Sequence, residues 1–176
     1  MSQPAEKPLA VCDPVWERVR TEAAEIADQE PLMASYLHAT ILQHQRFECA
    51  LAYQLAQKVG NGELNAMQLR ELFDGLLKDE LQIAEATRAD IVAYYERDPA
   101  CDSYIQPFLY FKGFHALQIY RLAHALWNDG RKQMALFLQN RISDLFAVDI
   151  HPAARIGRGV FIDHATGVVI GGTAGV

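Results

Sequence analysis

The sequence has few cysteines and no closely spaced pair of them. Cys12, Cys49 and Cys101 are the three cysteines in 176 residues, and none belongs to a CxxC motif. This pattern is typical of reduced thiols in the cytoplasm, and it disfavours a disulfide framework or a zinc site. We therefore predict a cytoplasmic protein without a bound metal.

Histidine pairs with metal-binding spacing are also missing. His115 and His124 are nine residues apart, and His38 and His44 are six apart. Neither spacing gives the usual pair of ligands on one face of a helix, so metal ligation is not expected. We interpret these histidines as hydrogen-bonded or exposed helix residues.

Long apolar runs and an excess of positive charge are absent as well. No uncharged apolar stretch approaches the length of a membrane span, and residues 1–10 lack the apolar segment of a secretion signal. The net charge of −6 argues against nucleic acid or an anionic membrane as a partner. We interpret four basic residues as part of a solvated face: Arg121, Arg131, Lys132 and Arg141.

Apolar residues are plentiful, at 51% of a chain whose length suits one domain or a domain plus a fragment. Residues 1–12 are predicted to be a loose tail, and Asp13 followed by Pro14 predicts a helix N-cap. The most aromatic helix is predicted to begin at Pro107, and its phenylalanines are interpreted as core or subunit interface. Apolar stripes and turn residues predict helices over residues 14–30, 33–41, 47–59, 66–78, 80–96, 107–127 and 132–146.

A different period begins at residue 148. Aliphatic residues then stand six positions apart, with small or turn-forming residues between them: Ile150, Ile156, Ile162 and Val168. This period is typical of a hexapeptide-repeat parallel β-helix, in which the aliphatic residues stack inward and glycines serve the corners. After Val168 the register shifts by two residues. We therefore predict a mainly helical domain over residues 13–147, followed by the start of a left-handed parallel β-helix over residues 148–176.

Two titratable residues in the last stretch are candidates for catalysis. Asp149 and His164 are fifteen residues apart, so they can lie on successive parts of one coil. A histidine oriented by a carboxylate is the minimum machinery for deprotonating a hydroxyl near neutral pH. For a lone Asp or His, a solvated loop residue is the better interpretation.

Three motifs carry a resemblance to a known family. The run DIHPAARIGRG, followed after three residues by DHATG, closely resembles bacterial serine acetyltransferase. The helical part contains ERDPACDSY and KGFHALQIYRLAHALWNDGR, which resemble a second signature of that family, and PLMASYLHATIL resembles its early helix. The resemblance extends from about Asp13 to nearly the end of the chain, in one order and with matching spacing.

The resemblance implies an acyltransferase of cysteine biosynthesis that moves acetyl from acetyl-CoA, as co-substrate, to the L-serine hydroxyl. It implies that His164 is the general base and that Asp149 holds and polarises its imidazole. It also implies that Asp98 and Asp163 help to bind serine through its ammonium group. This chemistry is coherent, since a neutral imidazole, with an ordinary pKa of about 6.5, can accept the hydroxyl proton as the new bond forms.

The family's β-helix continues beyond the point that corresponds to Val176. The resemblance places most CoA contacts there, together with a tail that docks into O-acetylserine sulfhydrylase. We therefore expect the 176-residue chain to be truncated and to have little acetyltransferase activity, with its CoA-binding residues beyond Val176.

Two alternatives remain open. The chain can be a non-catalytic helical assembly module, since in the family the helical domain joins two trimers into a homo-hexamer. It can also belong to another hexapeptide acyltransferase, although the ERDPA and KGFHALQIYR motifs argue against that alternative.

Overall fold

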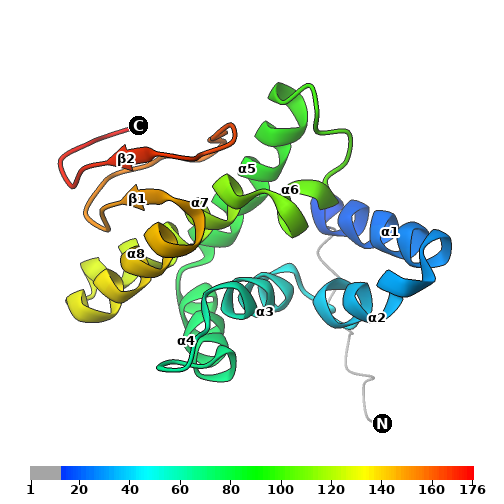
Figure 1. Ribbon diagram of the computed structural model, residues 1–176, viewed down its shortest axis with the longest axis horizontal. Coiled ribbons are helices and arrows are strands. Elements are labelled where there is room, and N and C mark those ends of the chain that lie inside the picture. The colour runs from blue at the N-terminus through cyan, green and yellow to red at the C-terminus, as the bar shows by residue number, and fades with distance from the viewer. Residues whose placement is uncertain (1–12) are drawn as a thin grey trace, which may run out of the picture.

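The computed structural model describes residues 13–176, most of which are in helices (Figure 1). The predicted tail over residues 1–12 lies outside the described residues. The elements follow in the order α1 (Pro14–Gln29), η1 (Pro31–Met33), α2 (Ala34–Leu37), η2 (His38–Leu42), α3 (Phe47–Val59), α4 (Ala66–Asp79), α5 (Leu81–Arg97), α6 (Ile105–Tyr110), α7 (Lys112–Asn128), α8 (Lys132–Phe146), β1 (Val148–Ile150) and β2 (Val168–Ile170).

Local sequence signals decide where several helices begin. Asp13 Oδ1 accepts a hydrogen bond from the backbone N–H of Trp16 at 3.1 Å, and Pro14 stands in the first turn of α1, which confirms the predicted N-cap. Asn65 and Gln68 form a reciprocal capping box at the start of α4. Helices α3 and α8 have the predicted bounds because an uninterrupted apolar stripe faces the core in each.

The prediction of a single helix from Pro107 is wrong, because two helices occupy this region. Helix α6 begins at Ile105, and Phe111 then leaves helical geometry with ψ of 110° before α7 begins. Pro107 lies in the first turn of α6, where its missing N–H removes no helical hydrogen bond. The buried ring of His115 spans the break, since its Nε2 lies 2.8 Å from the carbonyl oxygen of Phe108.

The helix predicted over residues 33–41 is also divided. A 3₁₀ turn, one α-helical turn and a π-helical turn follow one another as η1, α2 and η2. The wide turn is closed by a hydrogen bond from Gln43 N to His38 O at 3.0 Å. Leu37 and Ile41 of the predicted apolar face are nevertheless fully buried.

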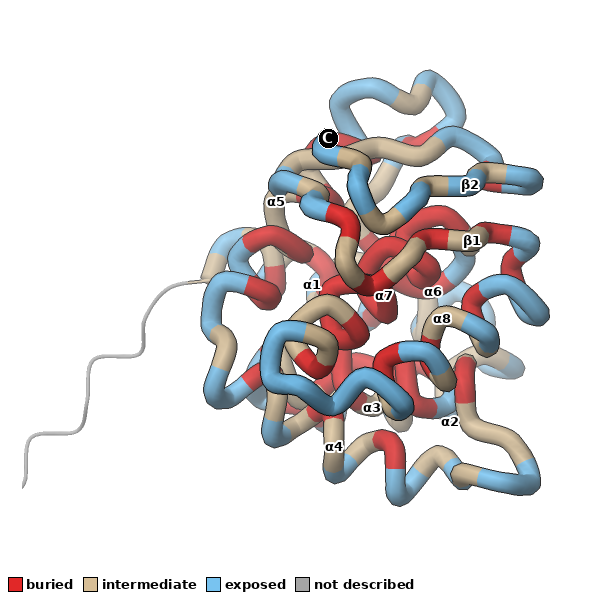
Figure 2. Tube along the Cα trace, turned by 90° about the vertical axis from the view of Figure 1, so that its left-hand side faces the viewer, coloured by how far each residue is buried: buried red, intermediate tan, exposed pale blue. Residues whose placement is uncertain are grey.

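Helix α7 runs through the centre of the molecule, with α3, α5 and α8 packed against it (Figure 2). Its aromatic residue Phe114 and its neighbour Phe108 on α6 are completely buried. Trp16, Phe47 and Phe108 form one ring cluster with centroids 5.7–6.1 Å apart. Phe108 and Phe114 are therefore core residues, whereas Phe111 is half-buried.

Residues 147–176, here called the coil, fold back on themselves beside α7 and α8 (Figure 1). β1 and β2 pair in parallel, with Val148 opposite Val168 and Ile150 opposite Ile170. One isolated parallel bridge joins Arg155 to Gly175. Among the described residues, these short pairings are all that represents the predicted β-helix.

No helix in residues 13–176 is long and apolar enough to cross a membrane.

Candidate active site

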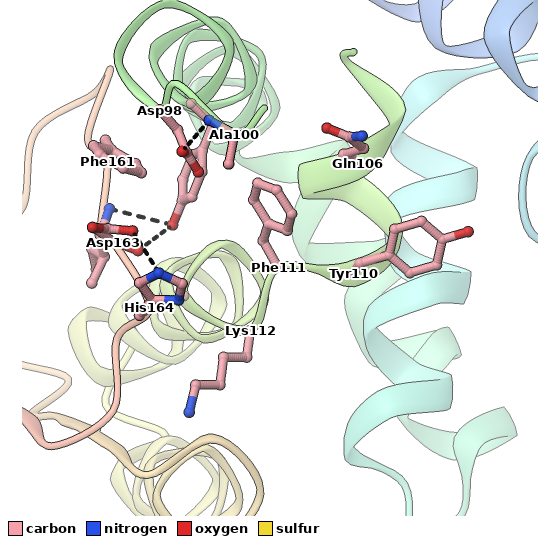
Figure 3. A pocket seen from close by; sticks show the side chains of 12 residues that line it. Asp98, Ala100, Gln106, Tyr110, Phe111, Lys112, Phe161, Asp163 and His164 are labelled. Atoms are coloured by element: carbon pink, nitrogen blue, oxygen red, sulfur yellow. Dashed lines mark hydrogen bonds and ion pairs between the residues drawn. The ribbon is translucent and has the colours of Figure 1, made fainter. Parts of the chain in front are cut away.

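A cavity of about 380 Å³ lies where the end of α5, the junction of α6 and α7, and the coil meet (Figure 3). Residues from all of these segments line it, although they are far apart in the sequence. The lining consists of Tyr94, Asp98, Ala100, Gln106, Tyr110, Phe111, Lys112, Gly113, Phe161, Ile162, Asp163 and His164.

Asp98 reaches the cavity because α5 ends there. It has extended geometry at the C-cap, with ψ of 110°, as expected for a residue before a proline. Its Oδ1 accepts a hydrogen bond from Ala100 N at 2.9 Å, which orients the carboxylate. The Asp98-Pro99 pair thus ends the helix and also presents a charged group at the cavity.

Asp163 and His164 enter the cavity from the coil. Asp163 Oδ1 lies 3.7 Å from His164 Nε2, and the two side chains are 62% and 95% exposed. His164 and Ala165 have φ of 49° and 58°, which is the left-handed region that residues with a Cβ rarely adopt. This strained turn presents the imidazole at the surface, where a ligand can reach it.

Asp149 does not line this cavity. It lies in the middle of β1, and its Oδ1 accepts a hydrogen bond from Gln139 Nε2 at 2.7 Å. No hydrogen bond joins Asp149 to His164 in the described part of the chain, where the carboxylate nearest to the imidazole is that of Asp163. The structure thus brings together three of the four residues singled out in the sequence: Asp98, Asp163 and His164.

Sequence reasoning missed Tyr94, whose hydroxyl lies beside the cavity. The hydroxyl donates to Ile162 O at 3.1 Å and accepts from Ile162 N at 3.3 Å. Burial raises the pKa of Tyr94 well above its usual value, so it stays protonated. The contact joins residues 68 positions apart, and nothing in the local pattern around Tyr94 indicates it. The KGFHALQ motif also contains Gly113, which lines the same cavity.

The interpretation of Arg121 as part of a solvated basic face is wrong. Its side chain is only 7% exposed, and its Nη2 lies 2.7 Å from Oδ2 of the fully buried Asp90. Its guanidinium also donates to the backbone carbonyls of Gly157 at 2.7 Å and Ile156 at 3.3 Å. The other oxygen of Asp90 accepts from Val160 N at 2.9 Å. This ion pair therefore connects α5, α7 and the coil.

Further side chains of the helical domain bond to the backbone of the coil. Each contact satisfies a carbonyl that a strand or a water would otherwise have to pair. Tyr120 donates to Ala154 O at 2.5 Å, His124 to Pro152 O at 2.6 Å, and Arg97 to Gly159 O at 3.0 Å.

No cluster of three or more His, Cys, Asp or Glu residues suited to holding a metal ion occurs among residues 13–176. The polar groups at the cavity include the carboxylates of Asp98 and Asp163, the imidazole of His164 and the ammonium of Lys112, which donates to Thr166 Oγ1.

The fold is thus a mainly helical domain that leads into a short parallel coil, with two carboxylates and an exposed histidine where the two meet. A family model described as the N-terminal domain of serine acetyltransferase matches residues 15–119. The chain belongs to the serine acetyltransferase family.

Individual relatives agree with this assignment. Serine acetyltransferase 2 from Arabidopsis thaliana is 51% identical over 162 residues, which are 92% of this chain and 50% of the relative. A crystal structure of serine acetyltransferase from Brucella abortus in complex with coenzyme A is 45% identical with a TM-score of 0.91, covering 94% of this chain and 66% of that chain. A serine acetyltransferase structure in complex with cysteine is 49% identical with a TM-score of 0.91, covering 92% and 63%. The chain thus spans about half the length of the first curated relatives that it matches.

Proposed function

We propose that this chain supplies the serine-binding part of a serine O-acetyltransferase, which transfers acetyl from acetyl-CoA to the L-serine hydroxyl and releases CoA. One observation carries the proposal, namely the cavity that gathers Asp98, Asp163 and His164 from two distant segments. The likeness to a structure that holds an amino acid, cysteine, supports a site for serine, which differs from cysteine only in its side-chain oxygen.

The two carboxylates are proposed to bind the ammonium group of serine. A cation between two carboxylates at a partly enclosed cavity gains more Coulomb energy than it does in bulk water. Asp98 is held in place by its hydrogen bond from Ala100 N. Asp163 adjoins His164 in the chain, so ammonium binding at Asp163 places the substrate hydroxyl close to the imidazole.

His164 is proposed to act as the general base. Its neutral imidazole takes the proton of the serine hydroxyl while the oxygen attacks the thioester carbonyl carbon. The tetrahedral intermediate then collapses, the carbon–sulfur bond breaks, and the imidazolium returns the proton to the departing CoA thiolate. The side chain of His164 is 95% exposed, so it is accessible for this transfer.

Asp149 is proposed to orient the imidazole of His164 in the complex with substrates. Support comes from the backbone, since Gly167 N donates to Ala147 O at 2.8 Å and so places the two segments on neighbouring turns. The role requires Asp149 to exchange its hydrogen bond from Gln139 for one from His164. In such a pairing the carboxylate sets the imidazole tautomer and stabilises the imidazolium.

Acetyl-CoA is proposed as the acyl donor, with its contacts beyond Val176. The relative from Brucella abortus holds coenzyme A, and its similarity covers 94% of this chain but 66% of that one. The coil is proposed to be the first turn of a left-handed β-helix. The free thiols of Cys49 and Cys101 support a cytoplasmic enzyme, because reduced cysteines are usual there.

A thiol-release assay with acetyl-CoA and L-serine tests the function. It is run on the 176-residue chain and on a chimera in which this chain is followed by the remaining residues of the Arabidopsis thaliana relative. Serine-dependent CoA release by the chimera is expected, with little release by the shorter chain. A folded chimera that binds acetyl-CoA without serine-dependent turnover contradicts the proposal.

Assembly into a homo-oligomer through the helical domain is a second proposed role, and exposed apolar side chains favour it. Leu32 is 96% exposed, Met67 80% and Leu81 61%, so these apolar side chains are available for burial against another copy of the chain. Sedimentation equilibrium at micromolar concentration is the test. A clean monomer of 19.7 kDa contradicts this role.

A further inference from the structure

We infer that Gly113 and Tyr94 are positioning residues, which together fix the backbone of residues 161–165 and thereby place Asp163 and His164. This inference rests on the proposed function, because it deepens the account of the same cavity. Neither residue is assigned a chemical step. They act through the loop that carries the proposed base and one of the proposed ammonium ligands.

Gly113 leaves no room for a side chain. It lies in the first turn of α7, and a Cβ added there would stand 2.5 Å from the carbonyl oxygen of Ile162. The same Cβ would lie 2.9 Å from the hydroxyl of Tyr94 and 3.1 Å from Cβ of Ala165. The first neighbour is backbone, so it can move away only if the loop moves. Glycine at position 113 therefore permits the close approach of this loop to α7.

Tyr94 holds the same loop from the side of α5. Its hydroxyl both donates to the carbonyl and accepts from the N–H of Ile162, so one side chain satisfies both backbone groups of that residue. The ring is 1% exposed, and it packs edge-on against Phe161 with centroids 4.9 Å apart. Tyr94 thus contacts the two residues that directly precede Asp163.

The turn that follows requires such support. His164 and Ala165 both have positive φ, although neither is glycine. Conformations of this kind persist only where surrounding contacts hold them. Ala165 is 1% exposed and lies against Gly113, so the buried half of the strained turn is held in place while the His164 side chain remains exposed.

The first experiment compares Gly113→Ala with Gly75→Ala, both in the 176-residue chain. Gly75 is an exposed helical glycine of α4, and an added Cβ there meets no atom within 4 Å. NMR records the Cε1–Hε1 signal of the His164 ring and its displacement on titration with L-serine. We expect Gly113→Ala to shift the ring signal and to weaken L-serine binding at least about tenfold. Gly75→Ala is expected to change neither quantity.

A second pair of variants tests the inference if Gly113→Ala does not fold. Tyr94→Phe and Tyr120→Phe each remove one buried hydroxyl that bonds to a carbonyl of the coil, but only Tyr94 lies at the cavity. If loss of a coil contact alone matters, the two variants alter the His164 signal equally, and the inference is overturned. A change confined to Tyr94→Phe supports it.

Failure of the proposed function is recognised separately. If L-serine does not bind the wild-type chain, the substrate assignment is contradicted, and the ring signal of His164 alone then decides the positioning roles. A folded Gly113→Ala variant with the wild-type His164 signal overturns the inference, whether or not serine binds.

Discussion

Asp90 on α5 and Arg121 on α7 form a buried ion pair through two hydrogen bonds, with Asp90 Oδ2 lying 2.7 Å from Nη2 and 3.1 Å from Nε. Both residues also bond to the backbone of the coil, at Ile156, Gly157 and Val160. A parallel coil normally satisfies its backbone groups by stacking on the next coil. Here side chains of the helical domain satisfy some of them instead.

The first prediction concerns this ion pair. Asp90→Asn leaves the buried guanidinium of Arg121 without its countercharge, which is expected to lower the free energy of unfolding by about 3 kcal/mol or more. Urea titration followed by circular dichroism measures the change. Asp13→Asn is the matched control, because Arg88 keeps Glu48 as a partner at 2.7 Å and asparagine still caps a helix. An equal decrease in the free energy of unfolding in the two variants would contradict the prediction that the buried Asp90 carboxylate contributes more to stability than that of Asp13.

A second prediction concerns the proposed general base. His164→Ala in the chimera is expected to lower kcat by at least about a hundredfold, within the usual range for losing a general base. The matched control is His38→Ala, which removes an exposed imidazole far along the chain from the cavity. Turnover near that of the control would remove His164 from the mechanism.

Substrate recognition gives a third prediction. Asp98→Asn removes one of the two carboxylates proposed to bind the serine ammonium, so KM for L-serine is expected to rise about tenfold or more. KM for acetyl-CoA is expected to change little, and steady-state kinetics with each substrate varied in turn separates the two. Asp102→Asn, four residues further on, is the control. A raised KM for acetyl-CoA with an unchanged KM for serine contradicts the assignment of Asp98.

The fourth prediction is a pH dependence of stability that arises from His115. Complete burial lowers its pKa from 6.5 to about 4, with a smaller contribution in the same direction from Lys58, against the hydrogen bond to Phe108 O. Between these two values the unfolded chain binds a proton that the folded chain does not. The contribution of neutral His115 to the free energy of unfolding is therefore fully present above about pH 6.5, and it is lost as the pH falls through about 4.

Because of His115, the free energy of unfolding is expected to decrease by roughly 3 kcal/mol between pH 7 and pH 4. Unfolding free energies of the wild type and of His115→Gln, measured across this range, isolate the contribution, because the other titrating groups are common to both proteins. The variant is expected to show a smaller decline with falling pH. Parallel curves for the two proteins would contradict the assignment.

Short-range signals in the sequence predicted much of the helical domain. The N-cap at Asp13, the stripe of α8 and the bounds of α3 depend on contacts within a few residues, which a pattern can express. The break at Phe111 could not be predicted in this way. Helix α7, which begins after this break, packs against the coil at Gly113, and the partner atoms there lie 49 and 52 residues further along the chain, at Ile162 and Ala165.

The candidate site, like the fold, was predicted from the sequence only in part. Motifs, through the resemblance they carry, singled out Asp98, Asp149, Asp163 and His164, and the fold brings all of these except Asp149 to one cavity. Only the tertiary structure decided that Arg121 is buried, that Tyr94 holds the loop before Asp163, and that Asp149 contacts Gln139. The physical reason is separation in sequence. The burial of Arg121 depends on its ion pair with Asp90, 31 residues away, and the hydrogen-bond partner of Tyr94 lies 68 residues away, so no local period can encode either contact.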